Sequence, residues 1–340
     1  MRHFLRFDRG VLGRGALFCG VALAVLVAQA NAVELLGYYE FEGDFSNSSG
    51  PLAAASAVQN PGEVSFVPLG FRGQAVDIND PAANGGSNTG GSVNIPHNAN
   101  PNEAPEVTFG AWVNLDSNAG FPGFMAIDNS GWDRGLHLNG NSWGIASGGN
   151  SAGLGGAATV GEWQYVVGTF NKPANRATIY VGNANPADQT TISGTRADGG
   201  NNPGEVEIEI GRYDNQDLDA LVDDAFVFDS ELNAHQANAI RNLRLSSADL
   251  SVADAADLFD LFDAGGGSAF VGGLLFTHTS GLDASNPGAV VDGGNGLITV
   301  VLDDNGNGLT AIPEPSSLVL GGLALLLSLG CGRLRRRSRK

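Results

Sequence analysis

Residues 205–232, EVEIEIGRYDNQDLDALVDDAFVFDSEL, determine how the rest of this chain is interpreted. Val206, Ile208 and Ile210 alternate with glutamates, which is the period-two pattern of a strand with one buried and one solvated face. Gly211 begins a polar loop, and residues 220–228 (ALVDDAFVF) predict a second strand. A strand, an acidic loop and a further strand indicate antiparallel β-structure.

Short strands are also predicted on the N-terminal side of this stretch. Glycine contributes 50 of the 340 residues, against an average usage of about 7%, and no repeat period accompanies it, so many tight turns are expected. Strands at this spacing without intervening helices are typical of a sandwich or jelly roll. The predicted strands are 35–41, 74–78, 92–95, 107–115, 124–127, 135–138, 143–146, 163–170 and 177–181.

Two helices are predicted after this β-rich region. Asn233 with Gln236 forms a capping box at the start of the first helix. The second helix begins near Ser251, where Asp254 completes the cap, and Gly265 ends it. Its apolar face at helical spacing consists of Ala255, Leu258, Phe259 and Phe262.

A small acidic extension is predicted over residues 247–312. It is rich in glycine and contains the second helix and two predicted strands, at 271–276 and 297–302. The sequence does not decide whether this mixed α/β extension packs on the sandwich or folds separately.

The charge distribution limits the partners of the folded body. Ten of the 18 Lys and Arg residues lie in segments 1–32 and 313–340, so residues 33–312 carry 8 basic against 34 acidic residues. A body this acidic repels nucleic acid and anionic lipid, and it either attracts divalent cations or simply stays soluble. Cys19 and Cys331 both lie in the terminal apolar segments, so no disulfide or thiolate metal site supports the body.

The N-terminal 32 residues are typical of a secretory signal peptide. Four arginines precede or flank the start of an apolar run at 16–28, and the segment ends in Ala30-Asn31-Ala32. We expect cleavage after Ala32 and export by the Sec machinery.

The C-terminal segment 313–340 has three parts. Pro313, Glu314 and Pro315 precede an apolar run at 318–329, and a basic cluster follows at 333–340. A helix over 316–332 would reach about 25 Å at ~1.5 Å per residue, which is short for a membrane span of about 20 residues. The basic cluster would hold the C-terminus in the cytoplasm. An ordinary single-pass anchor is the alternative.

This three-part layout resembles the PEP-CTERM sorting signal of bacterial exported proteins. The resemblance implies recognition by an exosortase, a membrane protease-transpeptidase, with removal of the tail near Pro313, Glu314 and Pro315. It also implies export through the inner membrane, transient anchoring by a short C-terminal helix, and a cell-surface or extracellular destination that is often linked to exopolysaccharide.

The body, over residues 36–245, resembles the LamG-like, concanavalin A-like jelly-roll family in the order of its motifs. Asn183 stands one position away from the family's place for it in the "Y-V-N-G" motif. The resemblance implies an all-β jelly-roll sandwich over 33–246 that binds carbohydrate or matrix without catalysis. The matching motifs are YYEF (38–41), FRGQAVDI (71–78), SVNIP (92–96), VTFGAWV (107–113), GEWQYVV (161–167), ATIYV (177–181), IGR (210–212) and LVDDAFV (221–227).

Two other functions stay open. Glu205, Glu207 and Glu209 resemble the E-x-D-x-E strand of laminarinase-type glycoside hydrolases, although Glu207 replaces the central Asp and no Trp flanks the triplet. A retaining pair needs carboxyls about 5–5.5 Å apart, whereas residues i and i+4 of a strand lie roughly 13 Å apart. We therefore expect a solvated strand face, with a hydrolase using Glu205 and Glu209 as one alternative. A structural matrix protein without a small ligand is the other.

A structural calcium site is expected at Asp44, Asp223 and Asp224. In this fold the first turn and the 221–227 strand are often close, and hard oxygen ligands suit Ca²⁺. The alternative is that Asp223 or Asp224 hydrogen-bonds a neighbouring loop. Residues 303–314 satisfy the EF-hand spacing literally, but no flanking helix is evident and Pro313 stiffens the loop, so a turn is expected there.

The tryptophans divide into two groups. Trp112 and Trp163 sit within strand patterns and are expected in the core, while Trp132 and Trp143 lie near loops and could stack on a sugar. The histidines at 97, 137, 235 and 278 show neither metal-ligand spacing nor a nucleophile partner. No catalytic triad is therefore predicted.

Overall fold

The computed structural model describes residues 33–82, 89–118, 120–127, 133–185, 191–198, 207–213, 216–246, 248–263, 266–278, 290–292, 298–302 and 306. They all belong to one unit of the chain, Val33–Lys340. None of the helices in these ranges has both the length and the apolar composition that a membrane crossing requires.

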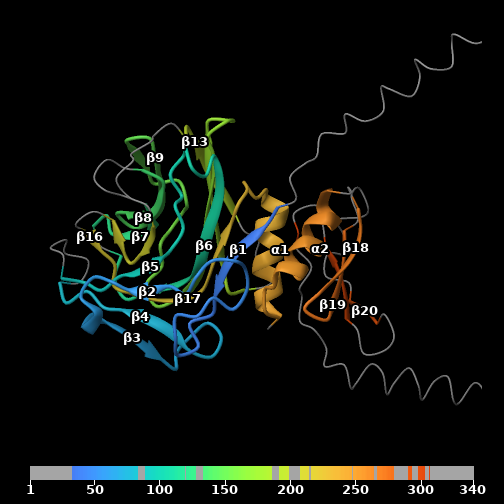
Figure 1. Cartoon of the computed structure of the whole chain (residues 1–340), viewed down its shortest axis with the longest axis horizontal. Helices are drawn as coiled ribbons and strands as arrows, with labels where there is room; N and C mark the ends of the chain where they lie inside the picture. The colour runs from blue at the N-terminus through green and yellow to red at the C-terminus, as the bar shows by residue number, and fades with distance from the viewer. Residues whose placement is uncertain are drawn as a thin grey trace, which may run out of the picture. The chain divides into compact units, whose positions relative to one another are not determined.

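An eight-stranded antiparallel sheet forms one layer of the molecule (Figure 1). Its strand order is β13-β12-β11-β6-β17-β4-β3, and β1 also pairs with β17. The strands are β1 (Leu35–Tyr39), β3 (Val64–Val67), β4 (Ala75–Ile78), β6 (Glu106–Leu115), β11 (Trp163–Asn171), β12 (Arg176–Asn183), β13 (Thr191–Arg196) and β17 (Ala220–Phe228).

A seven-stranded antiparallel sheet forms the second layer, in the order β10-β9-β8-β7-β14-β5-β2. A 3₁₀ turn, Pro61–Glu63, and a small hairpin of β15 (Arg212–Tyr213) and β16 (Gln216–Asp217) lie in the connections. The strands are β2 (Ser56–Ala57), β5 (Val93–Ile95), β7 (Gly123–Ala126), β8 (Gly135–Asn139), β9 (Ser142–Ser147), β10 (Asn150–Ala152) and β14 (Ile208–Ile210).

The main core lies between these two sheets, and strand alternation builds it. Val107, Phe109, Ala111 and Val113 of β6 all enter this core, while Trp112 faces the opposite side. From the other sheet, Ile208 and Ile210 of β14 enter the same core. The predicted all-β sandwich is therefore confirmed.

A second apolar cluster covers the outer face of the eight-stranded sheet. Phe226 and Phe228 of β17 pack there with α1 (Ala234–Leu245) and α2 (Val252–Asp263). The rings of Phe228 and Phe259 lie 5.3 Å apart between their centroids. The described part of the extension thus packs on α1 and on β1 of the sandwich through α2, and Figure 1 shows both helices on the β1 side of the sandwich.

A four-stranded sheet completes the extension, in the order β18-β19-β21-β20. Strand β19 (Leu274–His278) pairs in parallel with β21 (Ile298–Leu302). Strand β18 (Gly267–Val271) pairs antiparallel with β19, and β20 (Val290–Asp292) pairs antiparallel with β21. The prediction of one strand over 271–276 was wrong. Gly272 and Gly273 adopt φ of 56° and 78°, so the chain turns there into a hairpin.

The predicted helix starts are confirmed. The N–H of Gln236 donates to Asn233 Oδ1 (3.0 Å), and the N–H of Asn233 donates to Gln236 Oε1 (2.8 Å). At α2, the N–H of Asp254 donates to Ser251 Oγ (3.1 Å). The buried face of α2 contains Leu261, whereas Phe262 is only half-buried.

Strand β17 contains a β-bulge between Asp223 and Phe226. Val222 and Ala225 both face the core between the sheets, so the bulge places both aspartates on the outer face. Asp224 has a left-handed φ of 53°, which is uncommon for a residue other than glycine. At this point β17 exchanges β4 for β1 as its neighbour on one edge.

Several arginines are buried rather than exposed. The fully buried Arg134 forms an ion pair with Asp198 (Nη2 to Oδ2, 2.6 Å) and donates to the carbonyl of Ala99 (3.0 Å). Arg241, on α1, is also fully buried and donates to the carbonyl of Asn183 (2.7 Å from Nη2). These cations join loops and helices to the sandwich from within.

Truncating a side chain between α2 and the sheet tests this packing. We expect Leu258→Ala to lower the free energy of unfolding by about 2–5 kcal/mol, because it leaves a cavity in the second apolar cluster. Val252→Ala, an exposed position of the same helix, should change it by less than about 0.5 kcal/mol. Urea unfolding of both variants checks this, and equal effects would contradict the packing.

Candidate functional site

The two predicted metal ligands on β17 are both buried, and one of them, Asp224, forms an ion pair with Arg244. Asp224 Oδ1 accepts from Tyr38 Oη (2.5 Å) and Arg244 Nη2 (2.7 Å), and its Oδ2 accepts from Arg244 Nε (2.8 Å). Asp223 Oδ2 accepts from the backbone N–H of Arg72 (2.9 Å). The pair therefore joins β17 to β1 and to the end of α1.

The two carboxyls carry one negative charge between them. Burial, and next the charge of Asp224, raise the pKa of Asp223 to about 9. Burial also raises the pKa of Asp224, while Arg244 and the Tyr38 hydroxyl act in the opposite direction. Because Arg244 makes a two-point contact with Asp224, we place the charge on Asp224 and the proton on Asp223.

The expected calcium set does not fit this geometry. Asp44 is exposed, and its Oδ1 accepts from the N–H of Ser46 in a local turn (2.8 Å). Both oxygens of Asp224 are already occupied by Arg244 and Tyr38. Across the part of the chain that the structure describes, no three His, Cys, Asp or Glu side chains group closely enough to hold a metal ion. The three aspartates are thus a structural pair and a separate turn residue.

The predicted sugar-stacking tryptophans have different outcomes. Trp143 is fully buried between the sheets and its Nε1 donates to Gln164 Oε1 (2.9 Å), so the expectation of a stacking surface there is corrected. Trp132 lies outside the described residues, as do Pro313, Glu314 and Pro315. Trp112 is buried as predicted, but beneath the helices, where its ring stacks on Phe71 at 3.8 Å.

Polar side chains line one side of the outer face of the seven-stranded sheet. Ser92 Oγ donates to Glu209 Oε1 (2.6 Å), and Asn94 Nδ2 donates to Glu207 Oε2 (2.6 Å). Because Ile208 and Ile210 point inward, these glutamates point outward, as the sequence predicts. Glu205 lies outside the described residues.

Arg212 connects this face to the rim of the sandwich. Its Nη1 lies 3.8 Å from Glu209 Oε1, and its Nε lies 3.9 Å from Asp217 Oδ1. The guanidinium also donates to Gln59. The side chains of Arg212 and Glu209 are 23% and 20% exposed. We call Ser92, Asn94, Glu207, Glu209, Arg212 and Asp217 the polar track.

An open pocket of about 510 Å³ lies beside the polar track. It is linked to the track through Thr89, whose N–H donates to Asp217 Oδ2 (2.8 Å), and through Asn60, which follows Gln59 in the chain. In the sequence Arg212 appears only as part of the IGR motif and Asp217 was not singled out, because their mutual contact depends on the β15–β16 hairpin. The pocket is lined by Asn60, Pro61, Gly62, Glu63, Pro81 and Thr89.

The middle of the same face consists of small and buried residues. Glu209 lies in register with Ala126, and the row continues through Gly135 to Ala146. Ala126 and Ala146 are buried, as is His137, whose Nε2 lies 2.6 Å from Ser151 Oγ. The partly exposed members of the polar track are Asn94, Glu207, Glu209 and Arg212, while Ser92 and Asp217 are buried beside them.

Three carboxyls with raised pKa values lie where β4, β6 and β17 adjoin. Burial, and then the charge of Asp116, raises the pKa of Asp77, and burial raises the pKa of Asp116. Burial also raises the pKa of Asp219, while the hydrogen bond from the N–H of Asp80 acts in the opposite direction.

Comparison with protein families agrees with this architecture. Residues 86–238 match the family described as the concanavalin A-like lectin/glucanases superfamily. The sandwich is a concanavalin A-like jelly roll. A comparison with curated protein sequences gives no match for this jelly-roll chain.

Three solved structures illustrate the similarity. Domain 4 of AbnA, a GH43 extracellular arabinanase from Geobacillus stearothermophilus in complex with arabinotriose, is 13% identical, with a TM-score of 0.46, covering 61% of this chain and 98% of that one. The binding domain of Botulinum Neurotoxin DC in complex with SialylT is 14% identical (TM-score 0.43; 63% and 51% covered). Trypanosoma rangeli sialidase is 17% identical, with a TM-score of 0.42, covering 63% of this chain and 33% of that one. The chain thus spans about half of the toxin domain and a third of the sialidase.

The proton on Asp223 makes stability depend on pH. Its pKa in the folded state, about 9, lies above the value of ~3.9 for an unfolded chain, so the native state binds the proton more tightly. The associated stability is present below pH ~4 and is lost as pH rises toward 9, at up to about 1.4 kcal/mol per pH unit. We expect Asp223→Asn to flatten this decline, measured by urea unfolding from pH 5 to 9. Asp44→Asn should leave the decline unchanged, and an unaltered slope in Asp223→Asn would contradict the assignment.

Proposed function

We propose that this chain is an exported surface protein whose jelly roll binds carbohydrate without cleaving it, at the polar track and the adjoining pocket. The observation that carries the proposal is Arg212, which lies partly exposed between Glu209 and Asp217 beside an open pocket of about 510 Å³. Pockets of about 300–1,000 Å³ with a few oriented polar groups are typical of small-molecule sites.

The polar track has the donors and acceptors that sugar hydroxyls require. The guanidinium of Arg212 supplies only donors, while the carboxylates of Glu207 and Glu209 supply acceptors. Ser92, Asn94 and Gln59 already contact these groups. Because these contacts fix the side chains before a ligand arrives, little additional conformational entropy is lost on binding.

The arrangement of the glutamates favours binding over hydrolysis. In glycosidases the two carboxyls flank the scissile bond, and a retaining pair is about 5–5.5 Å apart. Glu205 and Glu209, the alternative catalytic pair, are four residues apart in the sequence, which corresponds to roughly 13 Å on an extended strand; Glu205 itself lies outside the described residues. Glu207 accepts a hydrogen bond from Asn94 of β5, and Glu209 accepts one from Ser92, the residue before β5.

The termini support an extracellular destination. Residues 1–32 have the features of a Sec signal peptide, and residues 313–340 resemble a PEP-CTERM signal. We infer export through the inner membrane, transient anchoring, processing by an exosortase near Pro313, Glu314 and Pro315, and release to a surface rich in exopolysaccharide. Carbohydrate binding would retain the processed protein there.

Removing the Arg212 charge tests the binding site. We expect the protein to be retarded in native gels containing a neutral polysaccharide from a panel of β-glucan, arabinan and galactomannan. Arg212→Gln should weaken retardation about tenfold, since a hydrogen bond to a charged group contributes about 1.5–3 kcal/mol. Arg176→Gln is the matched control, because Arg176 is an exposed arginine of the eight-stranded sheet that forms an ion pair with Glu231.

A reducing-end assay with the same polysaccharides, together with the gels, separates the alternatives. Release of reducing ends that Glu209→Gln abolishes would establish a hydrolase and contradict the non-catalytic proposal. Absence of retardation with every polysaccharide would contradict carbohydrate binding and favour a structural matrix role.

Changing the sorting motif tests the destination. Replacing Pro313, Glu314 and Pro315 together by Ala should leave the C-terminal segment attached in a bacterial host that contains an exosortase. The intact mass of the surface protein measures this, because the wild-type chain should lack residues 1–32 and its basic tail. An unprocessed wild-type chain would contradict the sorting proposal.

A further inference from the structure

A row of buried residues on the eight-stranded sheet contains polar atoms without partners. Trp112 of β6 and Asp223 of β17 lie opposite each other in register, and both face outward from the sheet. Trp112 Nε1 and Asp223 Oδ1 are buried and have no hydrogen-bond partner among the described residues, and the same holds for the hydroxyl of Tyr165, opposite Trp112 on β11. Because buried polar groups in folded proteins are almost always hydrogen-bonded, three unpaired atoms in one row indicate a site for a polar ligand.

The turn between β3 and β4 covers this row. The Phe71 ring stacks on the Trp112 indole, with 3.8 Å between the ring centroids and 8° between the planes. The backbone N–H of Arg72 donates to Asp223 Oδ2 (2.9 Å). Two consecutive residues of one turn therefore cover the two facing residues of the sheet.

This turn is bounded by glycines and lies at the surface. The N–H of Gly70 donates to the carbonyl of Gly73 (3.2 Å), and Gly73 has a left-handed φ of 66°. Arg72 Nη2 donates to the carbonyl of Leu245 at the end of α1 (2.5 Å), while Leu69, just before the turn, is 66% exposed. The stacked ring is thus held by one ring contact and by the hydrogen bonds of its neighbour, so it can be displaced by a change between the two glycines that leaves the sheet intact.

A half-buried row lies next to the covered one. Trp163 of β11, Asn114 of β6 and Leu221 of β17 are in register. The residues on either side of Asn114 and of Leu221 enter the main core, so these two side chains face outward. The ring of Trp163 meets that of Phe71 edge-on at 6.0 Å between centroids. The covered row therefore borders a row that is already in contact with solvent.

The chemistry of the covered row favours an uncharged ligand with hydroxyls. The indole offers a flat apolar face and one donor, while Asp223, which holds the proton of the aspartate pair, can both donate and accept. The charge of Asp224 is balanced by Arg244, so the row does not call for an ion. A purely apolar ring leaves the polar atoms unpaired, as Phe71 does. A sugar ring has both an apolar C–H face and hydroxyls at its edge.

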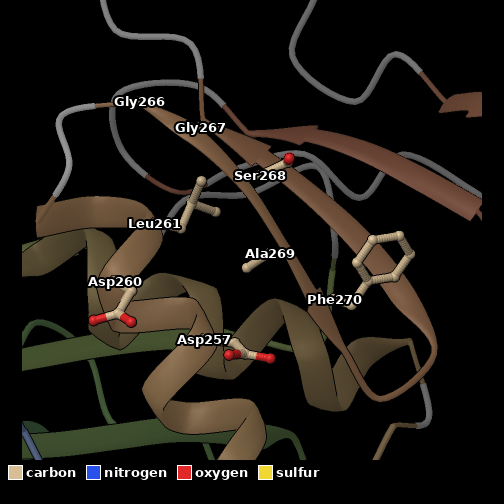
Figure 2. A pocket seen from close by; sticks show the side chains of 8 residues that line it. All are labelled: Asp257, Asp260, Leu261, Gly266, Gly267, Ser268, Ala269 and Phe270. Atoms are coloured by element: carbon tan, nitrogen blue, oxygen red, sulfur yellow. The ribbon is translucent and has the colours of Figure 1, made fainter.

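The open pocket between α2 and β18 does not gather such a set of groups. Its volume is about 360 Å³, and Figure 2 shows Asp257 and Asp260 on the helix and Phe270 on the strand. Ala269 packs with α2 in the second apolar cluster, so the neighbouring Phe270 side chain faces the opposite side of β18. Two exposed aspartates remain on the helix side, and they alone do not define a site.

We propose that Phe71 is the plug of a second carbohydrate site, in which one uncharged hexose unit of a polysaccharide stacks on Trp112 in place of the Phe71 ring. The hydroxyls of this unit pair with Trp112 Nε1 and the Asp223 carboxyl, and the adjoining units extend over the half-buried row at Trp163. The site lies on the eight-stranded sheet, whereas the polar track lies on the seven-stranded sheet. Because the ligand binds only when the plug is displaced, the affinity of the wild-type chain is reduced by the fraction of molecules that are open.

Removing the plug ring from the full chain tests the proposal. All chains carry Arg212→Gln, so that the polar track contributes little, and calorimetry with neutral hexaoses of glucose and of mannose measures binding. We expect Phe71→Ala to bind one of them about tenfold more tightly than the parent chain, with a change in tryptophan fluorescence. Leu69→Ala, at an exposed position of the same loop, should bind like the parent. Adding Asp223→Ala to Phe71→Ala should weaken binding about fivefold, whereas Asp223→Asn should retain it.

The other outcomes overturn the proposal. A Phe71→Ala chain with native circular dichroism and no gain in binding would assign the unpaired atoms to buried water. An equal gain in Leu69→Ala would indicate a general loosening of the loop, and binding of indole without any saccharide would assign the space to apolar ligands. If Phe71→Ala does not fold, Phe71→Leu, which fills the space without stacking flat, replaces it, and the absence of a gain there has the same meaning. Since Arg212→Gln is present throughout, failure here is distinguishable from failure at the polar track.

Discussion

Strand β17 pairs with β6 along one edge, while along its other edge it pairs first with β4 and then with β1. The bulge at this change of partner turns two consecutive aspartates onto the same face of the sheet. Burying two carboxyls together is costly unless a cation and hydrogen bonds compensate them. Arg244 of α1 and the hydroxyl of Tyr38 provide that compensation. The position of α1, and therefore the packing of α2 and the extension against it, thus depends on the β-bulge in β17.

The polar track depends on the opposite property, regular alternation. Ile208 and Ile210 are held in the main core, so Glu207 and Glu209 must face outward beside β5. A ligand surface placed on paired strands is more rigid than one on a free loop. The jelly roll therefore uses regular pairing where it presents polar groups and an irregular strand where it attaches its own extension.

The sequence predicted those parts of the fold that short-range patterns determine. Residues 220–228 were expected as a strand and form one, and the capping box at Asn233 was recognisable because its partner lies three residues away. Trp143 was misassigned, although its spacing from Ile145 matches an inward-facing strand position. The Arg244–Asp224 and Arg212–Asp217 contacts could not be derived, because a bulge and a small hairpin create them. The hairpin between β18 and β19 was also missed, because the pattern over 271–276 suggested a continuous strand where Gly272 and Gly273 form a turn.

The buried arginines also affect how copies of this protein meet one another. Residues 33–312 contain only eight basic side chains against 34 acidic ones, and Arg134, Arg241 and Arg244 are buried in the interior. The outer surface therefore has few cations with which to bind a second acidic copy. In a crowded layer, neighbouring molecules repel each other over roughly a Debye length, ~8 Å at physiological ionic strength. The same buried arginines that fix the helices and loops to the sandwich thereby leave an acidic outer surface that repels other copies of this chain.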